Sequence, residues 1–153
     1  MKVVINDCFG GFSLSHEAIM RYAELKGIKL YPWFDEITKK VYGERARIDN
    51  PEVNGWLHYS TVPKEEYKKI EEEEREKPVG KGRYEKTNDV YFSDRSIERT
   101  DPLLFKIIKE LGKKKASGRC ASLKVITIPD DVEWEIEEYD GWEHIAEKHR
   151  TWH

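Results

Sequence analysis

Apolar residues recur along the chain at strand and helix spacing. Residues 2–5 form a short run rich in β-branched side chains and predict a buried strand. A turn-rich loop over 6–12 follows, and then a stripe at helical spacing that ends before Gly27 predicts a helix. Residues 28–34 predict an extended strand, and Pro32 within it indicates an edge strand because proline has no N–H to donate.

The middle of the chain is more polar. Residues 56–59 indicate a strand, and residues 63–77 predict a highly charged helix that buries little apolar surface. Within this helix the run 71–74 consists of four glutamates and predicts a face in water.

The last third of the chain contains the clearest helical pattern. Asp101 and Pro102 predict an N-cap and a first-turn proline, apolar residues follow at helical spacing, and Gly112 ends the helix. The other elements expected here are a strand ending at 92, strands over 123–128 and 132–137, and a short C-terminal helix over about 142–149.

This order of elements predicts an α/β (α+β) fold. We expect a single domain over 1–153, with a mixed β-sheet flanked by two main helices and a short C-terminal helix. The charged segment 35–87 is interpreted as a helical insertion in this ligand-binding domain.

The amino-acid composition argues against several classes of protein. The chain has 153 residues, of which 38% are hydrophobic and 37% charged, and its 5 Trp, 8 Tyr and 5 Phe argue against wholesale disorder. No apolar run approaches a membrane span, and Asp7 follows the first strand too early for a signal peptide. The formal net charge of −3 argues against a DNA-coating protein. We therefore expect a cytoplasmic protein with two reduced cysteines, no membrane segment and no bound DNA.

The near-neutral total hides two charged segments. Residues 94–124 contain nine basic and four acidic side chains, a local balance of +5. Residues 130–148 contain nine acids and one lysine, a local balance of −8. The first segment is the natural place for an anionic ligand, although a lysine-rich helix face with a solvated loop accounts for the same charges.

Several residues of the cationic segment suit a nucleotide. Arginine grips phosphate with two parallel hydrogen bonds, aromatic rings stack on bases, and a helix start offers unpaired N–H groups. The small-residue loop 116–120 would also let a ligand approach the backbone closely. The candidate ligand-binding residues are Tyr91, Phe92, Arg95, Arg99, Asp101 and Arg119.

Two alternatives stay open from the residues themselves. One is a small hydrolase that uses Cys8, which lies in a glycine-rich loop after a strand, or one of the histidines 16, 58, 144 and 149. The other is a module that binds a protein partner through the acidic C-terminal strand. No motif joins Cys8 to a histidine, and the histidines lack the spacing of a zinc site, so we expect no catalytic residue, no metal and no cofactor.

Three stretches of the chain resemble a family of small phage and prophage proteins. They are residues 3–15 (VVINDCFGGFSLS), residues 94–102 with Asp94-Arg95 and Arg99-Thr100-Asp101-Pro102, and residues 128–134 (IPDDVEW) continuing to 147–152 (EKHRTW). Within that group the chain is similar to the Thoeris anti-defence sponge proteins. The resemblance covers about 1–34 and 88–152 and leaves out 35–87.

The resemblance implies a function and a set of partners. Such proteins hold cyclic ADP-ribose signals made by TIR-domain enzymes without cleaving them, and some also sequester cyclic di- or trinucleotides. It implies a non-enzymatic phage protein in the cytoplasm of the infected host, assembled as a homo-oligomer such as a dimer or a trimer of dimers. By the family pattern Phe92 would contact the adenine and Arg119 a phosphate. Apart from the resemblance, the cluster of Trp134, Trp142 and Trp152 indicates a core or a subunit interface, and packing of the C-terminal tail on another chain would deliver Arg150 to a shared site.

Overall fold

The structure of the chain is a computed structural model, and it describes residues 1–149. The α+β class is confirmed, since helices and strands are both well represented and the strands form several small sheets. The chain divides into two compact units, one made of Met1–Tyr22 with the segment from Ile97 onward and the other of Ala23–Ser96. The proposed role of Arg150 in subunit contacts lies outside the described residues.

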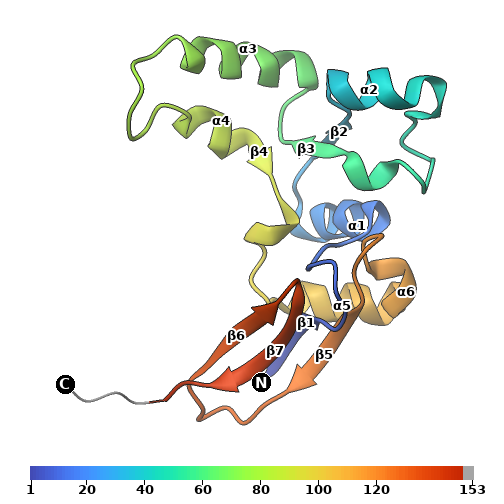
Figure 1. The fold of residues 1–153 in the computed structure, drawn as a ribbon, viewed down its shortest axis with the longest axis vertical. Helices are drawn as coiled ribbons and strands as arrows, with labels where there is room; N and C mark the ends of the chain where they lie inside the picture. Colours follow the sequence, from blue (N-terminus) through green and yellow to red (C-terminus); the bar gives the residue numbers. More distant parts are fainter. Residues whose placement is uncertain (150–153) are drawn as a thin grey trace. The chain divides into compact units, whose positions relative to one another are not determined.

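The first unit contains two pairs of antiparallel strands and the helices that cover them. Its elements are β1 (Lys2–Asn6), the start of α1 (His16–Lys26), α5 (Pro102–Leu111), α6 (Lys113–Ala116), β5 (Leu123–Thr127), β6 (Trp134–Tyr139) and β7 (Trp142–Glu147). Strand β1 pairs with β5, β6 pairs with β7, and β7 lies beside β1 (Figure 1). Between residues 1 and 149, no helix has the length and apolar character needed to cross a membrane.

The core of this unit follows the apolar pattern of the sequence. Val3 and Val4 of β1 are fully buried, as the β-branched run predicted, and Leu123 of β5 is buried with them. Leu104 and Ile107 supply the buried face of α5. Burying such side chains stabilises a fold by roughly 1.5–3 kcal/mol each, so this layer fixes β1 as the central strand of the unit.

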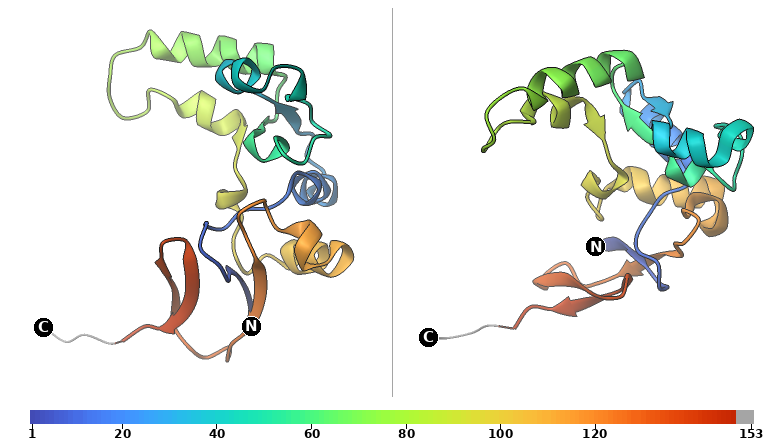
Figure 2. Two further views of the ribbon diagram at one scale, coloured as in Figure 1. Left: turned by 45° about the vertical axis from the view of Figure 1, so that its right-hand side comes forward. Right: turned by 45° about the horizontal axis from the view of Figure 1, so that its top comes forward.

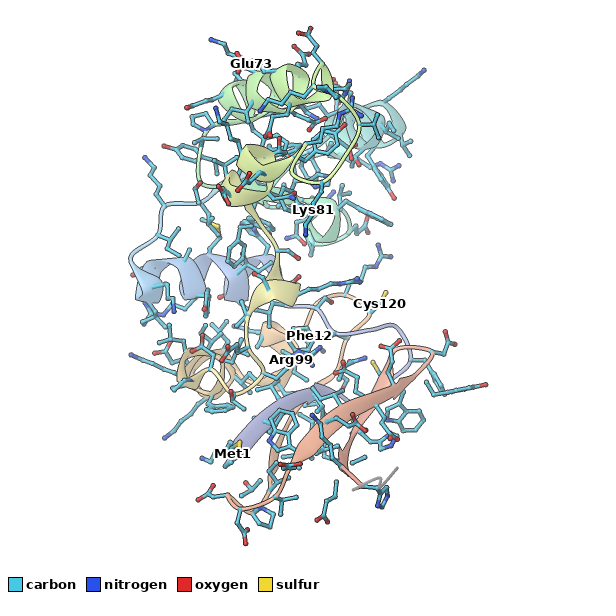
Figure 3. All side chains as sticks on the ribbon, turned by 90° about the vertical axis from the view of Figure 1, so that its left-hand side faces the viewer. Met1, Phe12, Glu73, Lys81, Arg99 and Cys120 are labelled. Atoms are coloured by element: carbon cyan, nitrogen blue, oxygen red, sulfur yellow. The ribbon has the colours of Figure 1, made fainter. Side chains whose placement is uncertain are left out.

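The second edge of β1 is closed by Arg99, through its backbone and side chain, and by the side chain of Glu143. The Val4 N–H donates to the Arg99 carbonyl at 2.8 Å, and the Arg99 guanidinium donates to the Val4 carbonyl at 3.2 Å. The Asn6 N–H donates to Glu143 Oε1 at 2.7 Å. Arg99 and Glu143 form two parallel bonds of 2.8 and 2.9 Å, and the guanidinium lies 3.5 Å from the centre of the Phe12 ring (Figure 3). An ion pair thus takes the place of a backbone ladder between β1 and β7.

The second unit is built on a three-stranded antiparallel sheet in the order β2-β3-β4. Its elements are β2 (Tyr31–Trp33), α2 (Glu36–Tyr42), η1 (Gly43–Arg45), η2 (Asn54–Trp56), β3 (His58–Ser60), α3 (Lys64–Arg75), α4 (Glu85–Val90), β4 (Tyr91–Phe92) and the 3₁₀ turn η3 (Asp94–Ser96). Strand β2, which contains Pro32, lies at the edge of the sheet as predicted.

The charged helix α3 lies beside α4, and a long loop connects them (Figure 2). Here one prediction was wrong, because Glu74 does not face water but is only 1% exposed. Its carboxylate accepts hydrogen bonds from the Thr87 hydroxyl at 2.8 Å and from the Thr87 and Lys86 N–H groups. These donors belong to the first turns of α4, whose N–H groups have no partner within the helix. Glu74 therefore ties α4 to α3.

Two further expectations are corrected. The sheets are antiparallel rather than mixed, because each is built from strands that pair in opposite directions. The C-terminal helix expected over about 142–149 is strand β7. Asp140 and Gly141 both have positive φ, 49° and 83°, which suits the two-residue turn of a β-hairpin and sends the chain back along β6.

Candidate ligand-binding site

Three loops of the first unit meet at one end of its strands. They are residues 7–13, residues 117–122 and the β6–β7 turn, and they approach so closely that only glycine fits at the contacts. A Cβ on Gly10 would lie 2.2 Å from the Cys120 carbonyl oxygen, one on Gly118 would lie 2.0 Å from the Ser13 hydroxyl, and one on Gly141 would lie 2.3 Å from the Gly11 nitrogen. The glycines therefore set where each loop can lie.

Asn6, the last residue of β1, holds the three loops together. Its side chain is fully buried and donates to the Cys8 carbonyl at 2.8 Å and to the Gly141 carbonyl at 2.7 Å. Its oxygen accepts from the Ser122 N–H at 2.8 Å. One amide thus satisfies backbone groups of all three loops, so the loop cluster is fixed by the protein before any ligand arrives.

Two aromatic rings stand exposed on this loop cluster. Phe9 is 55% and Trp142 45% exposed, and their rings meet edge to face with centres 4.9 Å apart. The Trp142 indole N–H donates to Asp7 Oδ1 at 3.0 Å. This hydrogen bond, with the nearby charge of Lys124, lowers the pKa of Asp7, so its carboxylate stays ionised and anchors the indole.

Cationic residues belong to the loops that meet in this cluster. Phe9 precedes Gly10 and Arg119 precedes Cys120, so both side chains lie one residue from the Gly10–Cys120 contact. Arg119 is exposed, as are the three lysines of α6, and the charge of Lys113 reaches Asp7, whose pKa it helps to lower. We call this surface the ring-and-cation patch, made of Phe9, Trp142, Arg119 and Lys113. Flat rings beside cations can bind a base or ribose together with phosphate.

The structure distributes the six candidates of the sequence analysis over both units. Tyr91 and Phe92 form β4, and Arg95 lies in η3, all in the second unit. Arg99, Asp101 and Arg119 belong to the first unit. The six candidates therefore fall into two sets, one in each unit. Of the six, only Arg119 belongs to the ring-and-cation patch.

The side chains of several candidates make contacts within the protein. Arg99 is occupied by Glu143, the Val4 carbonyl and the Phe12 ring, as described above. Phe92 is half-buried and pairs with Tyr59 across the sheet. Tyr91 is exposed, and its hydroxyl lies 2.9 Å from His58.

Asp101 is also occupied, as the N-cap of α5. Its carboxylate accepts from the Leu103 N–H at 2.9 Å and from the Tyr22 hydroxyl at 2.8 Å. We expect Asp101→Ala to destabilise the protein by about 1–2 kcal/mol, because a cap is lost and the Tyr22 hydroxyl loses its acceptor. Urea unfolding followed by circular dichroism measures this loss of stability. The variant Asp101→Asn keeps the capping oxygen and should therefore retain most of the wild-type stability. Wild-type stability in Asp101→Ala would contradict the capping role.

The thiol of Cys8 has neighbours other than histidine. It lies 3.4 Å from Asn6 Oδ1 and 3.3 Å from the Cys120 carbonyl oxygen, and its single S–H can donate to either acceptor. Of the four histidines that the sequence offers as its partners, His144 lies 3.0 Å from Glu137 across the β6–β7 hairpin. Within residues 1–149, these contacts hold Cys8 in the loop cluster.

Sequence reasoning missed the two rings of the patch. Phe9 was interpreted only as part of a turn-rich loop, and Trp142 as a core or interface residue. A usable signal was present, because Phe9 stands directly before two glycines in a loop. The position of Trp142 depends on the hairpin that the sequence analysis took for a helix.

The chain was compared with protein families, with curated proteins and with solved structures, and nothing matched in any of the three comparisons.

Proposed function

We propose that this protein binds a cyclic nucleotide signal of the cyclic ADP-ribose class and holds it without cleaving it. It would act as a homo-oligomer in the cytoplasm of a phage-infected host, as the resemblance implies. The observation that carries the proposal is the Gly10–Cys120 contact, which joins the loop of the exposed Phe9 ring, paired with Trp142, to the loop of the exposed Arg119.

The chemistry of the ring-and-cation patch matches such a ligand. A cyclic ADP-ribose presents a purine, ribose rings and two phosphates in a closed and rigid frame. An aromatic platform accepts the base, and guanidinium and ammonium groups accept the phosphates. Because the ligand is rigid and the loop cluster is fixed by Asn6, little conformational entropy is lost on binding. Tight capture therefore requires no chemical step.

A capture-and-release experiment tests the proposal. The protein is incubated with cyclic ADP-ribose isomers, freed of unbound ligand, and denatured by heat, and the released small molecules are identified by mass spectrometry. Release of intact ligand in proportion to protein supports sequestration. Altered ligand would indicate an enzyme, and absence of capture would contradict the proposal.

The variant Arg119→Ala tests whether the ligand binds at the ring-and-cation patch. We expect ligand affinity to fall about 10- to 150-fold, equivalent to the roughly 1.5–3 kcal/mol of a hydrogen bond to a charged group. Lys2→Ala is the matched control, because Lys2 is an exposed cation at the opposite end of β1 and should keep wild-type affinity. Calorimetric titration measures both variants. If Arg119→Ala binds as tightly as the Lys2→Ala control, the ligand site is not the ring-and-cation patch.

A further inference from the structure

The second unit contains a chain of titratable groups that the proposed function does not use. His58 lies between Asp35 and Tyr91, with its Nε2 3.1 Å from Asp35 Oδ2 and its Nδ1 2.9 Å from the Tyr91 hydroxyl oxygen. The imidazole is stacked on the Trp33 ring with centres 4.7 Å apart, which holds its plane. Tyr91 forms the exposed end of this chain.

The positions of the hydrogens along this row of hydrogen-bonded groups follow from the ionised state of Asp35. Asp35 is the N-cap of α2, and its Oδ1 accepts the Thr38 N–H at 2.7 Å. This bond and the His58 contact lower the pKa of Asp35 to about 2, so its carboxylate is an acceptor at any ordinary pH. His58 Nε2 must therefore carry the hydrogen. In the neutral imidazole Nδ1 is then bare, and it accepts the hydrogen of the Tyr91 hydroxyl.

Protonation of the imidazole reverses the last hydrogen bond. A proton added at Nδ1 points at the Tyr91 oxygen, which then becomes the acceptor. Burial and the charge of Asp94 raise the pKa of Tyr91, so the phenol keeps its own hydrogen. That hydrogen has to turn away from His58, toward solvent, where Tyr91 is exposed. A group that accepted hydrogen bonds from outside now donates one.

We propose that the Asp35–His58–Tyr91 chain makes the Tyr91 hydroxyl a proton-controlled binding site for an oxyanion, such as a phosphate group. With a neutral imidazole, the outward lone pairs of Tyr91 and the carboxylates of Asp35 and Asp94 repel an oxyanion. With a charged imidazole, the hydroxyl donates to it and the added positive charge offsets the carboxylates.

One neighbouring charge favours the binding of an oxyanion. Helix α3 packs its Tyr67 ring 6.0 Å from that of Tyr91, and the Lys68 ammonium lies 5.8 Å from the Tyr67 ring. Two other pairs of charged groups in this unit are matched with one another: Lys64 with Glu36 at 2.7 Å, and Glu71 with Arg75 at 2.8 Å. Lys68 contacts Glu71 only at 3.7 Å, which leaves an ammonium close to the tyrosine pair. The inference concerns the second unit by itself and does not depend on the proposed function.

Sulfate is the probe of choice, because it stays doubly charged over the range in which histidine titrates. Binding of sulfate is followed by NMR at pH 5.5 and 8.0, with chloride keeping the ionic strength constant. We expect about tenfold tighter binding at pH 5.5, the amount that corresponds to one hydrogen bond to a charged group. By reciprocity, saturating sulfate should move the titration midpoint of the His58 ring signals upward.

Two variants distinguish sulfate binding at the Tyr91 hydroxyl from a general electrostatic attraction of anions to the protein. Tyr91→Phe keeps the ring and removes the hydroxyl, so sulfate should bind it weakly at both pH values and shift the His58 midpoint little. Tyr84→Phe is the matched control, because Tyr84 is equally exposed in the same unit, and it should behave as wild type. Equal sulfate affinity in Tyr91→Phe and wild type at pH 5.5 would overturn the proposal, and so would an unmoved His58 midpoint in the wild-type protein.

Discussion

Arg99→Met is expected to destabilise the protein by about 3–5 kcal/mol, the cost of removing one partner of a buried ion pair. The Arg99 and Glu143 side chains are only 20% and 6% exposed. Without Arg99 the Glu143 carboxylate is left uncompensated, the Val4 carbonyl loses a donor, and the Phe12 ring loses its cation. The strand edge that this pair closes lies at the centre of the first unit.

Chemical unfolding of wild type and variants measures the loss. Arg21→Met is the matched control, since the Arg21–Glu110 pair is more exposed at 31% and 35%, and such pairs contribute about 0–1 kcal/mol. The double variant Arg99→Met with Glu143→Gln should recover part of the loss, because the amide still accepts the Asn6 N–H without a buried charge. If Arg99→Met costs no more than Arg21→Met, the ion pair does not close the β1 edge.

Gly141→Ala is expected to cost more than about 3 kcal/mol, although it adds a single methyl group. The added Cβ would lie 2.3 Å from the Gly11 nitrogen and 2.9 Å from its Cα, and these are backbone atoms that cannot turn aside. The turn would have to move, and with it the Gly141 carbonyl that Asn6 holds. We therefore expect weaker ligand capture as well as lower stability.

Gly112→Ala separates the close approach from backbone strain. Gly112 has the same φ of +83° as Gly141, but a Cβ on it would have open space around it. The difference in unfolding free energy between the two variants is the cost of the clash with the 7–13 loop. Equal losses in both variants would show that the loops can separate without penalty.

Both predictions concern the surroundings of β1, to which Asn6, Gly10, Gly11 and Arg99 belong. In the structure they hold the loop cluster and close the edge of β1, and Phe9 and Arg119 emerge from that cluster. A fixed framework of this kind is what a site needs in order to bind a rigid ligand without adjusting to it.

The local elements with strong signals could be predicted from the sequence. The Asp101 cap, the proline at the first turn and Gly112 gave α5 its bounds, and the β-branched run gave β1. Pro32 placed β2 at an edge. In each case the physical cause is a missing N–H, a capping oxygen or an apolar face. Each of these causes involves residues that are close together in the chain, so the sequence is sufficient to predict the element.

The candidate site was predicted less well, because its members are brought together over long distances in the chain. Arg119 was identified from its charge and its small-residue loop. Phe9 and Trp142 are more than 130 residues apart and became a ring pair only when β7 turned back beside β1. Glu74 gave no local sign of its buried role, since its donors belong to another helix.

The amino-acid sequence by itself determined the α+β class, the bounds of the main helices and the cationic character of residues 94–124. The tertiary structure decided which polar side chains are buried, that the C-terminal segment forms a hairpin, and that the loop of Phe9 contacts the loop of Arg119. The reason is physical: helix caps and strand patterns act between neighbours in the chain, whereas the pairing of Arg99 with Glu143 and the contact of Gly10 with Cys120 exist only after distant segments have packed.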